Sequence, residues 1–508
     1  MLKTDKTKNS KYEKVFVQKK FFPEPKALPV TQDKSIINKR YKFWRNSIFI
    51  TSYVIYLISY LCRKNFSIAA PLAVGLSSKD MGIVLAIGSI TYGIGKFVNG
   101  SFADKSNVRY ALPFNSMMAG VCSALLAFAS WINENFLKSH LGMLIYMCLF
   151  WGVSQWFQSA LFPYCAKSLV RWFPNSTRAT WWARWSTSHE LGSFIAMNIS
   201  LPIAAFSEHF FGKYGLEAMF IVPFILSILV GTIGIFSLRD RPISIGLPDV
   251  EEICSTKKNT LTKEEKKELD KESQLTYFQI LQKYVLKNKI MWNLSIVYFC
   301  VYVFRNGPVD WIFKILVDQE NSKNFSNFKD ALKNTNSLDA FKASTLCLIG
   351  FLGTLFAPFI SEKLFKGKRA PANFWSLFIG SFSLIGVWLG SSSFSPINNN
   401  FMIKNIIIFL SLGISGFTVC VPQVLVGGIC AIESSSKRVA SAATGFASLL
   451  GYFGAAFGHI INGFILNISN KNYGDARLVL IYWGVIALLG ALLCVPLWNV
   501  KANKEYSH

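Results

Sequence analysis

The sequence predicts an all-α membrane protein with twelve transmembrane helices in two pseudo-symmetric bundles of six. Three observations predict this class. Of the 508 residues, 52% are hydrophobic and only 16% are charged, whereas soluble domains carry about 25% charged residues. Apolar runs recur from Ile48 to Trp498, and a spanning helix needs ~20 such residues. A long polar segment then divides these runs into two equal groups.

The apolar runs place the predicted spans roughly at residues 46–62, 81–101, 111–131, 141–165, 181–206, 218–237, 290–312, 342–360, 373–391, 404–430, 439–466 and 477–499. The segment from Arg239 to Lys289 is polar, and acids and bases alternate in it as on a solvated helix. We therefore divide the chain into an N-terminal extension (1–45), a first bundle (46–237), a linker (238–289), a second bundle (290–500) and a tail (501–508). Two six-span halves are typical of transporters, because alternating access needs two bundles that move about a central site.

The charge balance is strongly basic, with 53 lysines and arginines against 28 acids and a formal charge of +25. Such a balance suggests either a nucleic-acid partner or the basic cytoplasmic loops of a membrane protein. The basic residues cluster on the N-terminal extension, the linker and alternate loops, while the opposite short loops carry isolated lysines such as Lys79 and Lys138. This bias predicts a multi-pass membrane protein with both termini cytoplasmic and no nucleic-acid partner.

Enzymatic and metal chemistry find no support in the sequence. The ten cysteines form no C-x-x-C pair, and His140, His209 and His459 are isolated, so no metal-ligand spacing is present. There is no G-x-S-x-G motif, and Gly95-Lys96 lacks the earlier glycine of a phosphate-binding loop. We expect neither an enzyme nor a cofactor.

Two arginines occupy equivalent places in the two halves. The first predicted span ends Tyr60-Leu-Cys-Arg63, and the seventh contains Tyr302-Val-Phe-Arg305. A charge inside the bilayer costs from ~2.5 to more than 10 kcal/mol and marks function by default. Guanidinium groups match phosphate oxygens with two parallel hydrogen bonds. The pair therefore predicts a site for a doubly charged anion, although each arginine alone is also compatible with snorkelling to a headgroup.

Further polar side chains follow the same helix faces. Tyr56, Tyr60 and Arg63 lie at i, i+4 and i+7, and Tyr92 precedes Lys96 by four residues, so each set shares one face of its helix. Phenol hydroxyls suit phosphate or sugar oxygens, and Lys96 adds a positive charge within the membrane. These residues are candidate substrate ligands together with Tyr302.

Eight motifs in order along the chain resemble those of the organophosphate:phosphate antiporters, a family of the major facilitator superfamily. They are Tyr60–Pro71, Ile90–Phe97, Asp104–Arg109, Ser188–Gly192, Leu238–Pro242, Gly246–Pro248, Arg305–Trp311 and Ala443–Phe446. The resemblance implies the major facilitator fold and the exchange of an organic phosphate for inorganic phosphate by a monomer in the lipid bilayer. The organic phosphate would be a sugar phosphate such as glucose 6-phosphate, or glycerol 3-phosphate. A hexose-phosphate sensor without net transport is the alternative.

The resemblance also implies roles for individual residues. Arg63 and Arg305 match the family's phosphate-binding arginines, and His189 matches the position of its pocket histidine. We count Tyr452, in the eleventh predicted span, among the candidate substrate ligands. Lys64 and Asp310 match an interhelical ion pair near the substrate, and we expect substrate arrival to weaken this pair and so lower the barrier to closure. A third set matches cytoplasmic gate residues, namely Asp104, Arg109, Glu362 and Arg369.

The fifth predicted span departs from the family's pattern. It carries Arg184 and Glu190, where the family usually has an apolar residue and an asparagine. We expect Glu190 either to stabilise a protonated His189 or to pair with Arg184, and either arrangement would change the coupling of substrate or proton. Pro422-Gln423 and Trp181-Trp182 resemble the sugar-phosphate and phosphosugar-sensor branch more than the glycerol-phosphate carriers.

Overall fold

The computed structural model describes residues 22–23, 25, 28–29, 33–73, 75–211, 215–250, 279, 282–320, 327–391, 400–430, 440–472 and 476–498. Within them the regular structure is helical throughout, with no strand. The whole tail (501–508), most of the N-terminal extension and the charged part of the linker lie outside these residues, as do the basic residues Lys437 and Arg438. The prediction of a solvated linker helix therefore falls outside the described part of the chain.

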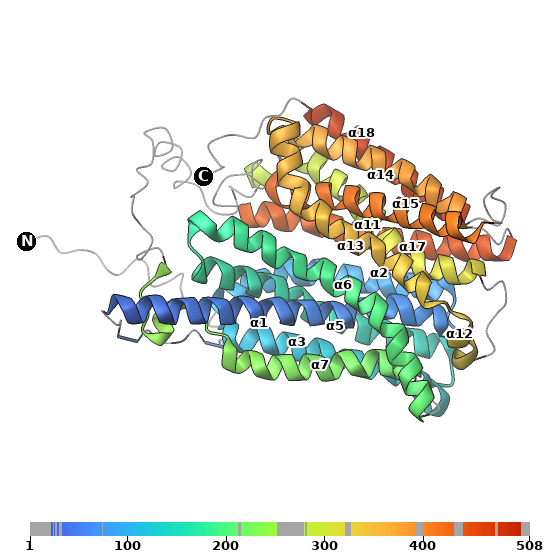
Figure 1. Ribbon diagram of the computed structural model, residues 1–508, viewed down its shortest axis with the longest axis horizontal. Coiled ribbons are helices and arrows are strands. Elements are labelled where there is room, and N and C mark those ends of the chain that lie inside the picture. The colour runs from blue at the N-terminus through green and yellow to red at the C-terminus, as the bar shows by residue number, and fades with distance from the viewer. Residues whose placement is uncertain are drawn as a thin grey trace, which may run out of the picture.

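Twelve helices of at least 18 residues form the body of the described structure (Figure 1). The first six are α1 (Lys34–Ala69), α2 (Ser78–Lys105), α3 (Val108–Ala127), α5 (His140–Trp172), α6 (Asn175–Phe211) and α7 (Gly215–Ser237). The second six are α11 (Lys289–Glu320), α13 (Ser337–Phe359), α14 (Arg369–Ser391), α15 (Phe401–Val424), α17 (Ala440–Asn472) and α18 (Arg477–Cys494). Two short helices, α4 (Ala129–Ile132) and α12 (Phe328–Asn334), lie in connections. We call the end of the bundle at which α1 begins the terminal end, and the opposite end the distal end.

Nine of these twelve helices are long and apolar enough on composition alone to cross a membrane, among the residues that the structure describes. The other three are α1, α5 and α11. Two of them carry the charges predicted to form the site, with Arg63 and Lys64 in α1 and Arg305 and Asp310 in α11. The helical structure of the described residues and these apolar helices confirm the predicted all-α fold class. The helices that fall short by composition include those that bring charge into the core.

Helix starts are set by short polar side chains, which accept hydrogen bonds from backbone N–H groups that have no partner within the helix. Ser77 and Asp80 form a reciprocal capping box at the start of α2, and Asn107 caps α3. At the start of α1, Asp33 accepts the backbone N–H of Ser35, which holds the pKa of this carboxyl below its usual range. The helix begins there, so residues 34–45 of the predicted extension are helical.

The two halves form separate bundles that meet along two main seams. Helix α2 packs along α17, and α6 packs along α13, while α1 touches α11 between them. Glycines permit the close approach of α2 and α17, because a Cβ on Gly82 would lie 2.6 Å from the carbonyl oxygen of His459. Near the distal end of the second seam, the Asn198 amide donates a 2.8 Å hydrogen bond to the Ser344 hydroxyl. Contacts close to the distal end therefore help to hold the halves together.

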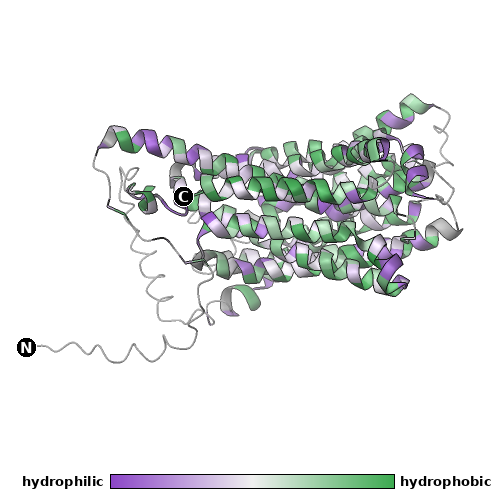
Figure 2. Ribbon diagram, turned by 90° about the horizontal axis from the view of Figure 1, so that it is seen from below, coloured by the Kyte–Doolittle hydropathy of each residue, from purple (hydrophilic) through white to green (hydrophobic). Residues whose placement is uncertain are grey.

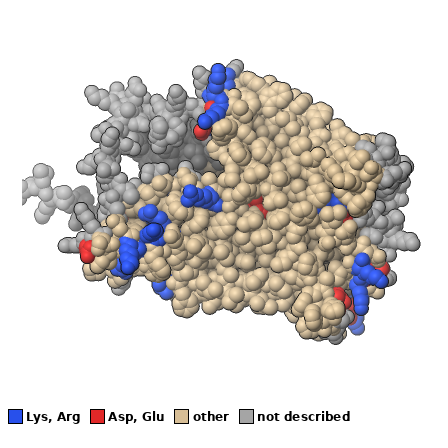
Figure 3. All heavy atoms as spheres, viewed as in Figure 1, with Lys and Arg blue, Asp and Glu red and all other residues tan. Residues whose placement is uncertain are grey.

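The outer surface between the two ends is apolar. Large hydrophobic side chains are exposed along it, such as Ile225, Leu229 and Ile233 on α7. Figure 2 shows hydrophobic residues over most of the length of the helices and hydrophilic ones gathered toward their ends. In Figure 3 the lysines and arginines of the visible face also lie toward the two ends. This distribution suits a bilayer, in which a charge on the lipid-facing side is costly.

The start of the linker is anchored to the first bundle by a buried aspartate. Asp240 accepts the backbone N–H of Val108 at 3.0 Å and lies 2.5 Å from Arg171 Nη1 and 3.8 Å from Lys167 Nζ. The Tyr41 hydroxyl donates to the carbonyl of Pro248, which ties the linker to α1. The motif Leu238–Pro242 thus holds the terminal end of the first bundle together.

Candidate functional site

The first arginine of the predicted site, Arg63, projects from α1 toward α5 and α2. Its Nε–H donates to the side-chain oxygen of Gln158 at 3.0 Å, and Nη1 donates to the Tyr60 hydroxyl at 3.2 Å. The guanidinium also lies over the ring of Tyr92, 4.3 Å from its centroid. Gln158 is fully buried. Gln158, Tyr60 and Tyr92 are all neutral side chains, so they orient the guanidinium without cancelling its charge.

One nitrogen of Arg63 remains available as a donor. Nη2 is buried and has no hydrogen-bond partner among the described residues. A buried donor without a partner costs about 1–3 kcal/mol, and more when it is charged. An anion that accepts this bond would recover that free energy.

The second arginine, Arg305, lies in α11 and meets a carboxylate. Its Nη2 is 3.1 Å from Oε1 of Glu190, which α6 contributes from the other half of the chain. The same oxygen lies 3.2 Å from Nε2 of His189 and 3.6 Å from the Cys420 sulfur. Of the two arrangements expected for Glu190, the structure therefore has the one beside His189 and not the pairing with Arg184. Arg184 is exposed, and its guanidinium lies over Trp181, 4.8 Å from the ring centroid.

Tyr60 contacts the first arginine and lies on the side of it that faces the second group. Its hydroxyl accepts a bond from Arg63, and the phenol is also close enough to Arg305 and Glu190 for electrostatic interaction. Its ring centroid lies 6.0 Å from that of His189. Two predicted arginines and the predicted histidine are thus grouped around one tyrosine at the meeting of the two halves.

The remaining predicted tyrosines form an aromatic wall beside this group. Tyr452 of α17 packs against Tyr92 at 4.6 Å and against Tyr302 at 4.9 Å between ring centroids. Lys96 reaches the Ser448 hydroxyl at 3.3 Å, and its ammonium lies 5.8 Å from the ring centroid of Tyr452. The wall therefore combines both halves of the chain and carries a third cation.

Tyr56 lies on the same side of α1, one turn before Tyr60. The ring centroids of the two tyrosines are 5.6 Å apart, and Tyr56 packs against Trp185 at 4.6 Å. The predicted stripe of Tyr56, Tyr60 and Arg63 is therefore formed by consecutive turns of one helix, and its first member is a packing residue in this conformation.

Lys64 and Asp310 form a second charged group across the two halves. Lys64 Nζ lies 2.5 Å from Asp310 Oδ1, and the Ser67 hydroxyl donates to the same oxygen at 2.9 Å. His459 Nε2 lies 3.8 Å from Asp310 Oδ2, and its Nδ1 accepts a bond from Trp311. A neutral His459 therefore carries its proton on Nε2, facing the carboxylate. All five side chains are buried.

The predicted gate residues lie at the terminal end, apart from the site. Arg369 Nη1 is 3.7 Å from Glu362 Oε1, and Glu362 is largely exposed. The Arg109 Nε–H donates to the carbonyl of Ile235. The side chain of Asp104 lies outside the described part of the structure.

Three site residues were missed by sequence reasoning, or were assigned otherwise. Gln158 carries no motif and sits in a long apolar helix. His459 appeared isolated because its partners come from α11. Glu190 was noticed as a departure and expected beside His189 or Arg184, but its contact with Arg305 was not foreseen. Arg184 and Glu190 are six residues apart and so point to different sides of α6, since successive residues are rotated by about 100°.

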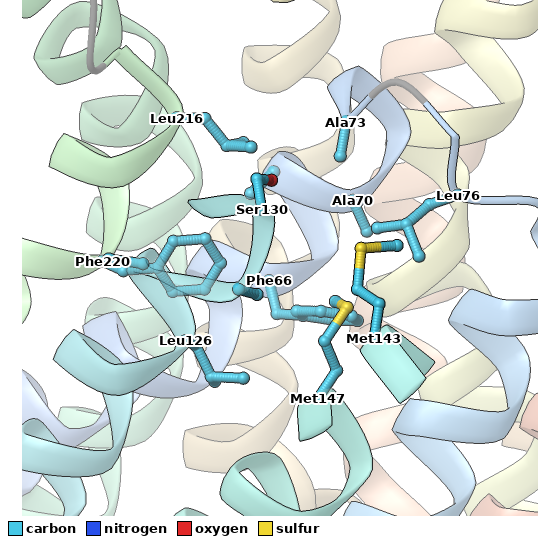
Figure 4. Close-up of a pocket in the computed structure, with 13 residues that line it drawn as sticks. Phe66, Ala70, Ala73, Leu76, Leu126, Ser130, Met143, Met147, Leu216 and Phe220 are labelled. Carbon is cyan, nitrogen blue, oxygen red and sulfur yellow. The ribbon is translucent and has the colours of Figure 1, made fainter. Parts of the chain in front are cut away.

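A separate cavity of about 40 Å³ lies in the first bundle near the distal end. Figure 4 shows Phe66, Leu126, Met143, Met147 and Phe220 around it. Its lining holds none of the predicted site residues and no charged side chain. It does not suit an anionic ligand, so the arginine group is the candidate site.

Comparison with known proteins decides the family. Residues 52–458 match the family model described as Major Facilitator Superfamily. The chain belongs to this superfamily. A bacterial homologue of the human lysosomal transporter Spinster, crystallised in an inward-facing and unoccupied conformation, has the same fold, with a TM-score of 0.59 at 14% identity over 90% of this chain and 97% of that one.

Relatives of nearly full length narrow the family within the superfamily. The chain is 31% identical to the probable hexose phosphate transport protein of Chlamydia pneumoniae, over 96% of this chain and 98% of the relative. It is 33% identical to the membrane sensor protein UhpC of Salmonella typhimurium, again over 96% and 98%. It is 30% identical to the hexose-6-phosphate:phosphate antiporter of the same organism, over 82% of each chain. The predicted membership of the organophosphate:phosphate antiporter family is confirmed, and the chain is not an enzyme.

Proposed function

We propose that this member of the family exchanges an organic phosphate for inorganic phosphate by alternating access. The observation that carries the proposal is the buried Nη2 of Arg63, which has no partner among the described residues, at a site that Arg305 approaches from the other half. A phosphoryl group supplies several acceptor oxygens and a double negative charge, which suit two guanidinium groups. One site between two bundles can face each side of the membrane in turn.

The cargo is a sugar phosphate such as glucose 6-phosphate, or glycerol 3-phosphate. Two relatives described above are named for hexose phosphate, which favours the sugar phosphate. The aromatic wall of Tyr92, Tyr302 and Tyr452, together with Tyr60 beside it, provides hydroxyls and rings that suit a polar ring with apolar faces. Tyr56 packs against Trp185 in this conformation and would reach the cargo only in another one. His189 supplies a further donor close to Arg305, and Lys96 adds positive potential.

The remaining parts of the proposal concern the setting of the transporter. We infer a monomer in a bacterial inner or plasma membrane, because the relatives described above are bacterial. Both termini lie in the cytoplasm and there is no nucleic-acid partner, since the basic residues concentrate on one set of loops. Lys64 and Asp310 act as a coupling ion pair. Glu362 and Arg369, together with Asp104 and Arg109, act as a gate at the terminal end.

A counterflow experiment tests the exchange. Proteoliposomes loaded with inorganic phosphate should take up labelled glucose 6-phosphate, and vesicles without internal phosphate should take up far less. Equal uptake into both kinds of vesicle would contradict exchange. Competition between unlabelled glucose 6-phosphate and glycerol 3-phosphate in the same vesicles then ranks the two cargoes.

A sensor without net transport is the second candidate, because the chain is 33% identical to the membrane sensor protein UhpC. The two candidates share a binding site and differ in flux. Saturable binding of glucose 6-phosphate by purified protein, without counterflow in either kind of vesicle, would favour the sensor.

A further inference from the structure

Glu190 has no part in the proposed exchange, yet it lies at the centre of the site. Its carboxylate is almost completely buried, with 2% of the side chain exposed. A buried carboxylate is costly unless cations or donors surround it. Here Arg305 Nη2, His189 Nε2 and the Cys420 thiol all approach the same oxygen, Oε1.

The two arginines of the site are therefore in different states. Arg63 meets neutral acceptors, Gln158 and Tyr60, and keeps one nitrogen of its guanidinium without a partner among the described residues. Arg305 is already paired with a carboxylate. In this conformation Arg63 presents an unneutralised charge to an incoming anion, whereas the charge of Arg305 is met by the protein itself.

A phosphoryl group and a carboxylate use the same hydrogen-bonding directions of a guanidinium. They also repel each other at close range, and the repulsion is strong where water is excluded. The charged and titratable groups facing Glu190 come from four other elements and from its own helix: Tyr60 (α1), His189 (α6), Arg305 (α11), Cys347 (α13) and Cys420 (α15). Arg305 is the only one of these groups that always carries a positive charge. An anion that binds to Arg305 must therefore displace the carboxylate of Glu190 from its guanidinium.

We propose that Glu190 is a built-in competitor of the cargo for Arg305, and that it sets how tightly the site holds a phosphoryl group. Binding then replaces one anion on Arg305 by another, and the displaced carboxylate remains beside the Nε2 of His189. Binding of the cargo to Arg305 breaks the contact between Arg305 and Glu190, and this loss offsets part of the free energy of binding. The cargo is therefore held less tightly than it would be if both arginines were unpaired before binding. A weakly held cargo is released readily, which a carrier requires on both sides of the membrane.

This inference rests on the proposed function for its cargo, but it is tested on binding as well as on transport. The variant is Glu190→Gln, which keeps the size of the side chain and removes its charge. The probe is inorganic phosphate, measured by calorimetry on purified protein and by phosphate self-exchange in proteoliposomes. We expect the dissociation constant for phosphate to fall about tenfold, and the exchange rate at saturating phosphate to fall as well. A dissociation constant that is unchanged or larger would overturn the proposal.

Two further variants make the result specific. Glu217→Gln removes a half-buried carboxylate at the start of α7, outside the site, and should leave the dissociation constant unchanged. Glu190→Asp keeps the charge on a shorter side chain that reaches Arg305 less well, and should tighten phosphate binding two- to threefold. It provides the same test if Glu190→Gln does not fold, since unchanged or weaker binding by Glu190→Asp would then reject the proposal.

The outcomes separate this inference from the proposed exchange. If wild-type protein binds phosphate but does not exchange it, the exchange proposal fails, and the binding comparison still tests Glu190. If wild-type protein exchanges phosphate and Glu190→Gln behaves identically, the competitor role alone is rejected. Thermal unfolding gives an independent reading, because phosphate should raise the melting temperature of Glu190→Gln more than that of wild type.

Discussion

Lys64 and Asp310 belong to opposite halves of the chain, and their charged atoms lie 2.5 Å apart in a buried position. Each is adjacent to the arginine group in its own helix: Lys64 follows Arg63 directly, and Asp310 comes five residues after Arg305. Each arginine therefore shares a helix with one member of this ion pair. If cargo binding moves either arginine, we expect the movement to reach the pair, which lies where the two bundles meet.

The first prediction concerns this link. Asp310→Asn leaves the Lys64 ammonium buried without its carboxylate, and breaking a buried pair in this way costs about 3–5 kcal/mol of stability. The double variant Lys64→Gln with Asp310→Asn removes both charges and should recover most of the melting temperature. If the pair couples cargo binding to closure, Asp310→Asn should exchange phosphate more slowly than wild type, and the double variant should remain as slow although its stability is recovered. Full recovery of exchange, or an unchanged rate and affinity in Asp310→Asn, would contradict coupling.

The second prediction concerns the geometry of the two guanidinium groups. Arg63→Lys and Arg305→Lys keep the charge but lose the paired donors. A hydrogen bond to a charged group contributes about 1.5–3 kcal/mol, so the half-saturating phosphate concentration should rise roughly 10- to 150-fold in each variant. Arg305→Lys should also lower the melting temperature more than Arg63→Lys, because Glu190 loses its closest guanidinium donor.

Arg45→Lys is the matched control for the two variants Arg63→Lys and Arg305→Lys. Arg45 lies in the same helix as Arg63 but toward the terminal end, where its Nε–H donates to the carbonyl of Trp172. Phosphate affinity should not change in this variant. Equal losses of affinity in all three variants would show that the effect is one of general stability rather than of the site.

The sequence was sufficient to predict the fold class and to single out the two arginines of the candidate site. Both predictions depend on the composition of a spanning helix. A spanning helix has a length and composition that can be read directly, and Arg63 and Arg305 stand out because charge is rare in such a segment. The partners of these residues could not be identified in the same way. Gln158 meets Arg63 and Glu190 meets Arg305 only because of how helices distant in sequence are rotated and packed, and no local pattern encodes that rotation.

The same limit applies to His459. Its sequence neighbours are glycine and isoleucine, and its partners Trp311 and Asp310 lie about 150 residues earlier in α11. The close approach of α17 to α2 depends on Gly82 and Gly463, which are common residues in any membrane helix. Spacing within one helix therefore predicts which residues share a face, and packing between helices decides what that face meets.

The third prediction concerns Lys96. Its ammonium is half-buried beside Ser448 and Tyr452, and a unit charge near a bound anion contributes at least about 1 kcal/mol even in a watery environment. Lys96→Gln should raise the half-saturating phosphate concentration at least about fivefold with little change in melting temperature. Lys79→Gln, near the distal end of the same helix, is the control and should bind phosphate as wild type does. A shift of equal size in both variants would argue that net charge, not position, is responsible.

The fourth prediction separates stability from binding. Asp240 is buried at the terminal end and is shared by Lys167, Arg171 and the backbone N–H of Val108. Asp240→Asn removes the negative charge from a place where the cations Lys167, Arg171 and Arg241 converge. By the same reasoning as for Asp310, it should cost about 3–5 kcal/mol of stability. Asp240 belongs to neither the arginine group nor the aromatic wall, so the half-saturating phosphate concentration should stay within about twofold of wild type.

The measurement for Asp240→Asn pairs thermal unfolding in detergent with phosphate self-exchange at a temperature well below the transition. A lowered melting temperature with unchanged affinity would show that the motif Leu238–Pro242 holds the first bundle together. A changed affinity would instead mean that the terminal end communicates with the site through α5, the helix that carries both Lys167 and Gln158.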